Sequence, residues 1–273
     1  MKIMVWMTGW LVMTGVTYAE LPRIVCLGGA VTETVWALGG ADWVIGVDDS
    51  STFPEDAGLL PRVGYYRMIS AEGVLSLHPD LVLASEEAGP REALMQIERA
   101  GVRVERIRAE ASVEGCLQRI HEVGVAIGRA EAAEALANEI GEAMAGLTVE
   151  EGRERRVMFV FAHGAGAMNV AGRDTAADRM IRLAGGRNAV TGYRGYRPLT
   201  SEAMVAADPE VILVTTGSLP AFGGGEAIWR VPGVQATSAY AERRVVAMDD
   251  LLLLGFGPRL PSAVMELQRL IGR

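Results

Sequence analysis

The sequence predicts an α/β protein of two similar lobes that one long, rigid helix joins. An internal repeat is the first reason, because residues 70–83 recur loosely as residues 200–213. The second is that short apolar runs alternate with helical segments, which is typical of parallel sheets covered on both faces. The third is a helical period that continues from about residue 113 to residue 147, between the two halves.

Both copies of the repeat carry the same signals in the same order. Ser70 and Thr200 stand where a helix should begin, and each is followed two positions later by a Glu. A Pro comes after each predicted helix end, and a continuous apolar strand follows. The repeat therefore indicates two related lobes, and lobes that share a cleft commonly enclose a ligand between them.

The order of the segments predicts where the lobes begin and end. The first lobe is expected at residues 20–112, the connecting helix at 113–148 and the second lobe at 149–273. Gly124 and Gly128 weaken the helix prediction only modestly, so we expect one unbroken strut and little hinge motion. The predicted strands are residues 23–27, 43–47, 81–84, 102–107, 156–161, 211–215 and 245–248.

The N-terminal segment reads as a cleaved secretory signal over residues 1–19. Lys2 is its only charge, an apolar run follows, and Ala19 is the small residue that a signal peptidase prefers. A membrane anchor is the alternative, but the apolar run of about 14 residues is shorter than the roughly 20 needed to span a bilayer. We therefore expect a secreted protein with no stable membrane insertion after cleavage.

Charge and composition exclude several classes of partner. The formal net charge is −8 and the isoelectric point is near 5.1, so there is no electrostatic reason to bind nucleic acid. Cys26 and Cys116 have no CxxC partner, which favours a role as small buried hydrophobes, with one long-range disulfide as the alternative. No catalytic motif is present, and the glycine turn at residues 28–32 lacks the GxGxxG pattern, so we expect no enzyme activity.

Three segments, residues 63–67, 70–75 and 252–259, resemble the haem-binding proteins of haem-uptake ABC transporters. These belong to the periplasmic substrate-binding proteins of the cobalamin, siderophore and haem class. The resemblance covers the whole mature chain and implies a class III periplasmic binding protein with two Rossmann-like lobes. It implies a periplasmic monomer that captures ferric haem b in the inter-lobe cleft. The haem is then delivered to an inner-membrane ABC permease and its ATPase, and a siderophore or a corrinoid is the alternative ligand.

Tyr65 is the residue that the resemblance implies as the iron ligand. A phenolate is an anionic oxygen that suits ferric iron, and the ordinary pKa of a phenol near 10 falls when a metal or an arginine stabilises the anion. Arg67 is two positions further along, and in extended backbone the two side chains would face the cleft together. Tyr66 is the alternative ligand.

His163 follows the predicted strand at residues 156–161, at the carboxyl end where ligands of α/β sheets gather. The resemblance implies that it binds the same iron or a second haem, and a hydrogen bond to its own glycine-rich loop is the alternative. Arg173 and Arg259 are candidates for the haem propionates, and each has a solvated or structural role as its alternative.

Glu72 and Glu202 occupy the same place in the two copies of the repeat. Each opens a predicted helix, where the helix dipole stabilises a carboxylate, and that alone is a sufficient structural reason. The resemblance implies a further role, in which the two matched acids dock into arginine pockets on the two permease subunits.

Overall fold

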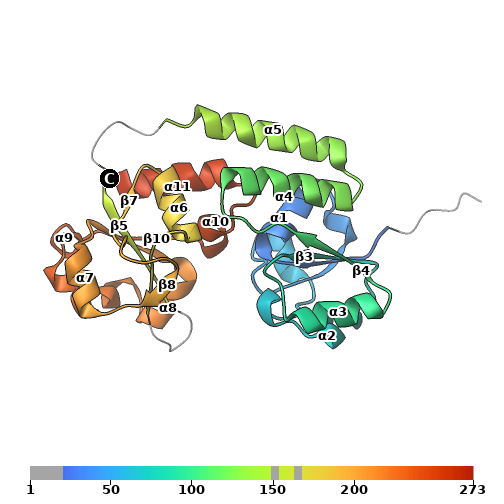
Figure 1. Ribbon diagram of the computed structural model, residues 1–273, viewed down its shortest axis with the longest axis horizontal. Coiled ribbons are helices and arrows are strands. Elements are labelled where there is room, and N and C mark those ends of the chain that lie inside the picture. The colour runs from blue at the N-terminus through green and yellow to red at the C-terminus, as the bar shows by residue number, and fades with distance from the viewer. Residues whose placement is uncertain (1–20, 149–153, 163–167, 273) are drawn as a thin grey trace, which may run out of the picture.

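The computed structural model describes residues 21–148, 154–162 and 168–272, which form two α/β lobes placed side by side along the long axis (Figure 1). The predicted signal peptide and His163 lie outside the described residues. No helix within the described ranges is both long and apolar enough to cross a membrane. The predicted fold class is confirmed: two α/β lobes, with helices that bridge them along one side.

The first lobe contains one parallel sheet with the strand order β2-β1-β3-β4. Every residue of β1 and β3 is buried, because the central strands are covered on both faces. The strands are β1 (Ile24–Leu27), β2 (Val44–Val47), β3 (Leu81–Ser85) and β4 (Arg103–Ile107). The helices are α1 (Gly29–Ala37), α2 (Ala71–Leu75) and α3 (Arg91–Arg99).

The second lobe contains a mixed sheet with the order β10-β9-β5-β6-β8, and β7 pairs with β5. Its central strands are parallel as predicted, but β6 runs antiparallel to β5, and β8 runs antiparallel to β6. The strands are β5 (Arg156–Phe161), β6 (Asn169–Ala171), β7 (Arg187–Asn188), β8 (Tyr196–Pro198), β9 (Val211–Thr215) and β10 (Val245–Met248). The helices are α6 (Ala176–Leu183), α7 (Ser201–Ala207), α8 (Leu219–Phe222), α9 (Ser238–Ala241), α10 (Asp250–Leu254) and α11 (Leu260–Gly272).

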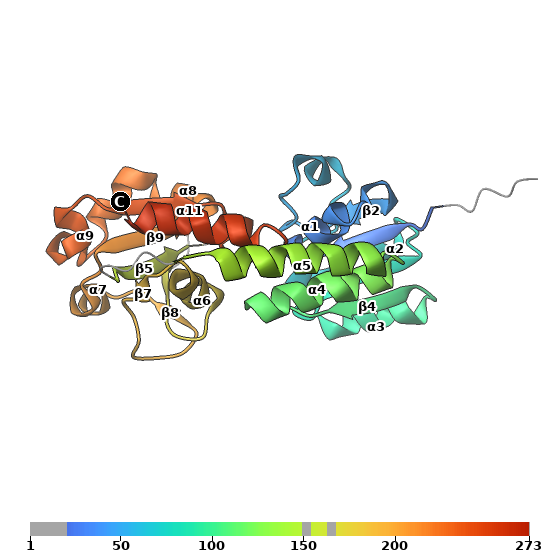
Figure 2. The ribbon, with the colours of Figure 1, turned by 90° about the horizontal axis from the view of Figure 1, so that it is seen from above.

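The expected unbroken helix over residues 113–148 is wrong. Two helices, α4 (Val113–Ala126) and α5 (Ala130–Gly146), pack side by side, and α5 alone leads to the second lobe (Figure 2). Gly128 adopts a φ of 71°, a conformation that ends a right-handed helix. A Cβ on Gly124 would collide with Ala133, so that glycine lets the two helices approach closely.

One hydrophobic core extends through both lobes, with residues from α1, α4, α5, α6 and α11. Polar contacts reinforce it where the lobes meet. Arg259 forms a salt bridge of 2.9 Å with Glu33 of α1, and the Cys116 thiol lies 3.3 Å from the Gly257 carbonyl oxygen. Cys26 and Cys116 are both buried and free, which fits their predicted role as small hydrophobes. The lobes are therefore tied firmly along the helical side.

Candidate functional site

A cavity of about 780 Å³ lies between the lobes, within the size range of small-molecule sites. Its first-lobe wall consists of the loops that follow β1, β2 and β3, together with Tyr65, Tyr66 and Arg67. Its second-lobe wall consists of Gly217 and of residues around α10. Because the first-lobe strands are parallel, the cavity lies at their carboxyl ends, where ligands of α/β proteins gather.

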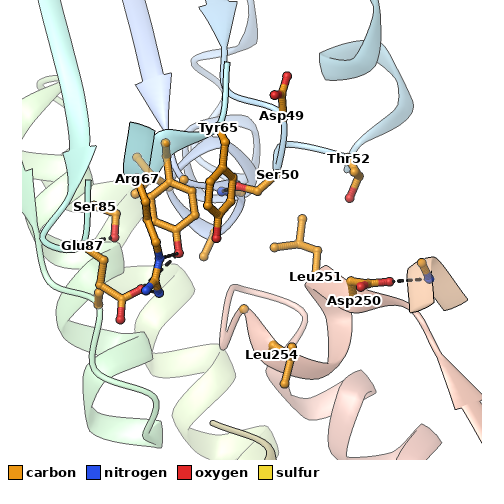
Figure 3. A pocket seen from close by; sticks show the side chains of 18 of the residues that line it. Asp49, Ser50, Thr52, Tyr65, Arg67, Ser85, Glu87, Asp250, Leu251 and Leu254 are labelled. Atoms are coloured by element: carbon orange, nitrogen blue, oxygen red, sulfur yellow. Dashed lines mark hydrogen bonds and ion pairs between the residues drawn. The ribbon is translucent and has the colours of Figure 1, made fainter. Parts of the chain in front are cut away.

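Tyr65 and Tyr66 both line the first-lobe wall of the cavity, where Figure 3 shows Tyr65. Gly64 has a φ of 90°, which turns the chain before Tyr65, and a 3₁₀ helix (Tyr66–Met68) begins immediately after it. The two rings meet edge to face, with centroids 4.9 Å apart. Tyr65 is 44% exposed, so its phenol is open to a ligand.

Arg67 contacts Tyr66 rather than Tyr65. Arg67 Nε donates a hydrogen bond of 2.8 Å to Tyr66 Oη, Tyr66 Oη donates one of 3.1 Å to Glu87 Oε2, and the Arg67 guanidinium pairs with the same carboxylate (Figure 3). Tyr65 and Arg67 both face the cavity, as expected, but Tyr66 faces it too, because the 3₁₀ turn ends the extended backbone at Tyr65. All three side chains line the cavity.

The surroundings of Tyr66 hold its phenol in the neutral form. Burial is the largest cause and raises the pKa of Tyr66 far above its ordinary value. The negative charge of Glu87 acts in the same direction, while the hydrogen bond from Arg67 opposes both. Tyr66 is therefore a poor source of phenolate in the ligand-free protein.

The second-lobe wall combines apolar side chains with carboxylates. Leu251 and Leu254 face Tyr65 across the cavity (Figure 3). Asp249 Oδ1 accepts a hydrogen bond of 2.8 Å from the Leu252 N–H, and Asp250 accepts one of 2.8 Å from the Gly217 N–H. The arrangement offers a phenol on one side, an apolar surface opposite it and polar groups at the edges.

The other predicted contacts lie elsewhere. Arg259 is held by Glu33, its guanidinium carbon lies 3.6 Å from the centre of the Phe53 ring, and it does not line the cavity. Arg173 is exposed next to β6 and does not line the cavity either. Most of the other lining residues were missed by sequence reasoning, and the charged ones among them include Glu87 and Arg119, because nothing in their local sequence distinguishes them from surface charges.

Glu72 and Glu202 have equivalent positions in the structure, at the second residue of α2 and of α7, and both are exposed. Ser70 Oγ accepts a hydrogen bond of 3.4 Å from the Gly73 N–H, and Thr200 Oγ1 accepts one of 3.1 Å from the Ala203 N–H. The predicted helix starts are thus confirmed in both copies of the repeat.

Comparison with known proteins identifies the family. The model of the periplasmic binding protein family matches residues 24–252. The chain belongs to that family. Among curated relatives of this periplasmic binding protein, the ABC transporter substrate-binding lipoprotein YvrC of Bacillus subtilis is 29% identical over 91% of the chain and 79% of its own length. The cobalamin-binding protein of Halobacterium salinarum is 30% identical over 89% of the chain and 67% of its own length.

Two solved structures closely match the fold of this periplasmic binding protein. The periplasmic haem-binding protein RhuT from Roseiflexus sp. RS-1, in its apo form, is 40% identical with a TM-score of 0.87. The periplasmic haem-binding protein BhuT, in complex with two haems, is 44% identical with a TM-score of 0.85. Each comparison covers 92% of this chain and 97% of the other.

Proposed function

We propose that this protein captures ferric haem b between its two lobes in the periplasm and delivers it to an inner-membrane ABC importer. The observation that carries the proposal is the cleft itself, in which the exposed phenol of Tyr65 faces the apolar side chains of Leu251 and Leu254. That pairing suits a flat apolar macrocycle with a ferric centre. Identity of 44% to a protein solved with two haems supports the same ligand.

Tyr65 supplies the iron ligand in this proposal, as its phenolate oxygen. Tyr66 is the alternative ligand. However, its phenol already forms hydrogen bonds with Arg67 and Glu87, and its surroundings favour the neutral form. Arg67, on the cavity wall, stabilises the tyrosine pair through its hydrogen bond to Tyr66.

The second lobe contributes His163, either to the same iron or to a second haem. The two haems of the related BhuT complex support a cleft with room for more than one macrocycle. Arg173 and Arg259 remain proposed contacts of the propionates. For Arg259 this role requires that its guanidinium leave Glu33, which makes it the weaker of the two.

Delivery uses the two lobes together. Glu72 and Glu202 each present an exposed carboxylate from the first turn of a short helix, one in each lobe. A pair of matched acids suits the two subunits of an ABC permease, which its ATPase drives. We further propose that residues 1–19 direct secretion and that the mature protein is a monomer.

Titration of the purified mature protein with hemin and, separately, with cyanocobalamin distinguishes the candidate ligands. The cobalamin-binding relative is the reason to include a corrinoid. We expect hemin to give a shifted, saturable Soret band and cyanocobalamin to give no change. Saturable binding of cyanocobalamin without hemin binding would assign the cleft to a corrinoid, and binding of neither would contradict both.

A further inference from the structure

The two sides of the cavity differ in charge. In Figure 3 Asp49 and Asp250 lie on one side of Tyr65, and Arg67 and Glu87 lie on the other. Arg67 and Glu87 form an ion pair and largely cancel each other. A second arginine, Arg119 of α4, also lines the cavity.

Arg119 is a buried cation on which the charges of Glu122, Glu87 and Glu33 act without direct contact. Its side chain is on the cavity wall although the residue is only 3% exposed, and it forms no salt bridge with any residue that the structure describes. Burial lowers the pKa of Arg119, which reflects the cost of keeping a charge out of water. A buried charge of this kind favours a ligand of opposite sign.

Backbone carbonyls accept all the hydrogen bonds that Arg119 donates. Arg119 Nε lies 2.9 Å from the Arg108 oxygen, and Nη1 lies 2.6 Å from the Phe256 oxygen. Two further contacts, to the carbonyls of Gly255 and Glu110, are 3.4 Å long, near the limit at which a hydrogen bond still stabilises. Carbonyl dipoles solvate the guanidinium but leave its net charge in place.

We propose that Arg119 binds a propionate carboxylate of the haem, so that the propionate edge points toward α4 and away from the aspartates. This inference rests on the proposed function, because it takes haem as the ligand. A carboxylate would replace the two long carbonyl contacts with shorter, charge-assisted hydrogen bonds. On the opposite side, Asp49, Asp249 and Asp250 would repel the same group.

The test compares hemin with hemin dimethyl ester, whose propionates carry no charge, in wild-type protein and in the Arg119→Gln variant. Wild-type protein should bind hemin more tightly than the ester. Arg119→Gln should weaken hemin binding by about tenfold to a hundredfold and leave the ester nearly unchanged. The two changes remove one interaction, so their effects should not add.

Arg244→Gln is the matched control, since the Arg244 guanidinium also donates a hydrogen bond to a backbone carbonyl, that of Ile271 at 2.7 Å, but does not line the cavity. It should keep the preference for hemin over the ester. An equal loss of affinity for hemin and for the ester in Arg119→Gln would overturn the inference. Arg119 would then have only a structural role, through its hydrogen bonds to the backbone carbonyls. Loss of the preference in Arg259→Gln instead would assign the propionate to Arg259. If wild-type protein bound neither compound, the proposed function itself would fail.

A second approach covers the case in which Arg119→Gln does not fold. Arg119→Lys keeps the charge but not the planar guanidinium, so an intermediate preference for hemin is expected. A crystal structure of the wild-type haem complex requires no variant. A propionate oxygen within hydrogen-bond distance of Arg119 would support the inference, and propionates beside Asp49 or in solvent would overturn it.

Discussion

Glu87 organises the tyrosine pair at the cleft. It balances the charge of Arg67 and accepts a hydrogen bond of 3.1 Å from Tyr66, which leaves Tyr65 as the phenol open to a ligand. Sequence reasoning found both tyrosines and Arg67 because they are contiguous. Glu87 lies 20 residues beyond Arg67, and only the meeting of two loops brings the two side chains together. The sequence motif therefore identifies both tyrosines as candidate ligands, but it does not show which of the two forms a hydrogen bond with Arg67.

The raised pKa of Tyr66 predicts how stability changes at high pH. A phenol that ionises less readily in the folded protein stabilises the fold below its unfolded pKa of about 10, and this contribution is lost as the pH rises above that value. We therefore expect the free energy of unfolding of wild-type protein to fall more steeply than that of Tyr66→Phe between about pH 10 and pH 11.5. Denaturant titrations at several pH values measure it. Parallel curves for the two proteins would contradict this account of Tyr66.

Secondary-structure elements were predicted best where burial is complete. The strands at the centre of both sheets match the predicted apolar runs, because a strand covered on both faces needs an uninterrupted apolar sequence. The short strands β6 and β8 have only three residues each, too few to show a period. The break between α4 and α5 depends on Gly128, and glycine alone is a weak signal because helices tolerate it.

Glycine-to-alanine changes test the helix pair directly. Gly124→Ala should destabilise the protein by about 1–3 kcal/mol, because the new methyl group would collide with Ala133 of α5. Gly141→Ala is the matched control, since its Cβ would meet only Leu117, at 3.8 Å, and alanine is the better helix former. We expect that variant to be more stable by about 0.5–1 kcal/mol. Thermal and denaturant unfolding measure both, and equal effects would contradict the close packing of α4 on α5.

At the scale of the whole molecule, the two lobes are joined along one side. A shared core and the buried pair of Glu33 with Arg259 connect them along the helical side, while the cavity lies between them. Glu72 and Glu202 lie in the first turns of α2 and α7, one in each lobe. The repeat in the sequence predicted this pairing, since each copy supplies one lobe with one acid. A matched pair of acids, one in each lobe, is suited to a partner with two equivalent subunits.

Reversal of both charges tests docking. In the double variant Glu72→Arg with Glu202→Arg, positive charge should face the proposed arginine pockets of the two permease subunits. Like charges across an interface cost several kcal/mol. Haem transport into vesicles that contain the cognate importer should collapse, while hemin affinity should remain, because neither residue lines the cavity. Glu131→Arg with Glu134→Arg, an equal charge change on exposed positions of α5, should transport normally. Normal transport by the Glu72→Arg, Glu202→Arg variant would contradict the docking role and leave these two residues with only a structural role at the helix starts.

The central claim is that Tyr65 is the haem-iron ligand, and a hemin titration of Tyr65→Phe tests it most directly, with Tyr66→Phe as the matched control. Changes next to a metal ligand typically cost 10- to 100-fold in affinity, so loss of the ligand itself should cost more than about 100-fold. We predict that Tyr65→Phe loses both tight binding and the wild-type Soret spectrum, while Tyr66→Phe keeps both. A wild-type spectrum and affinity in Tyr65→Phe, with loss of both in Tyr66→Phe, would contradict the account and assign the iron to Tyr66.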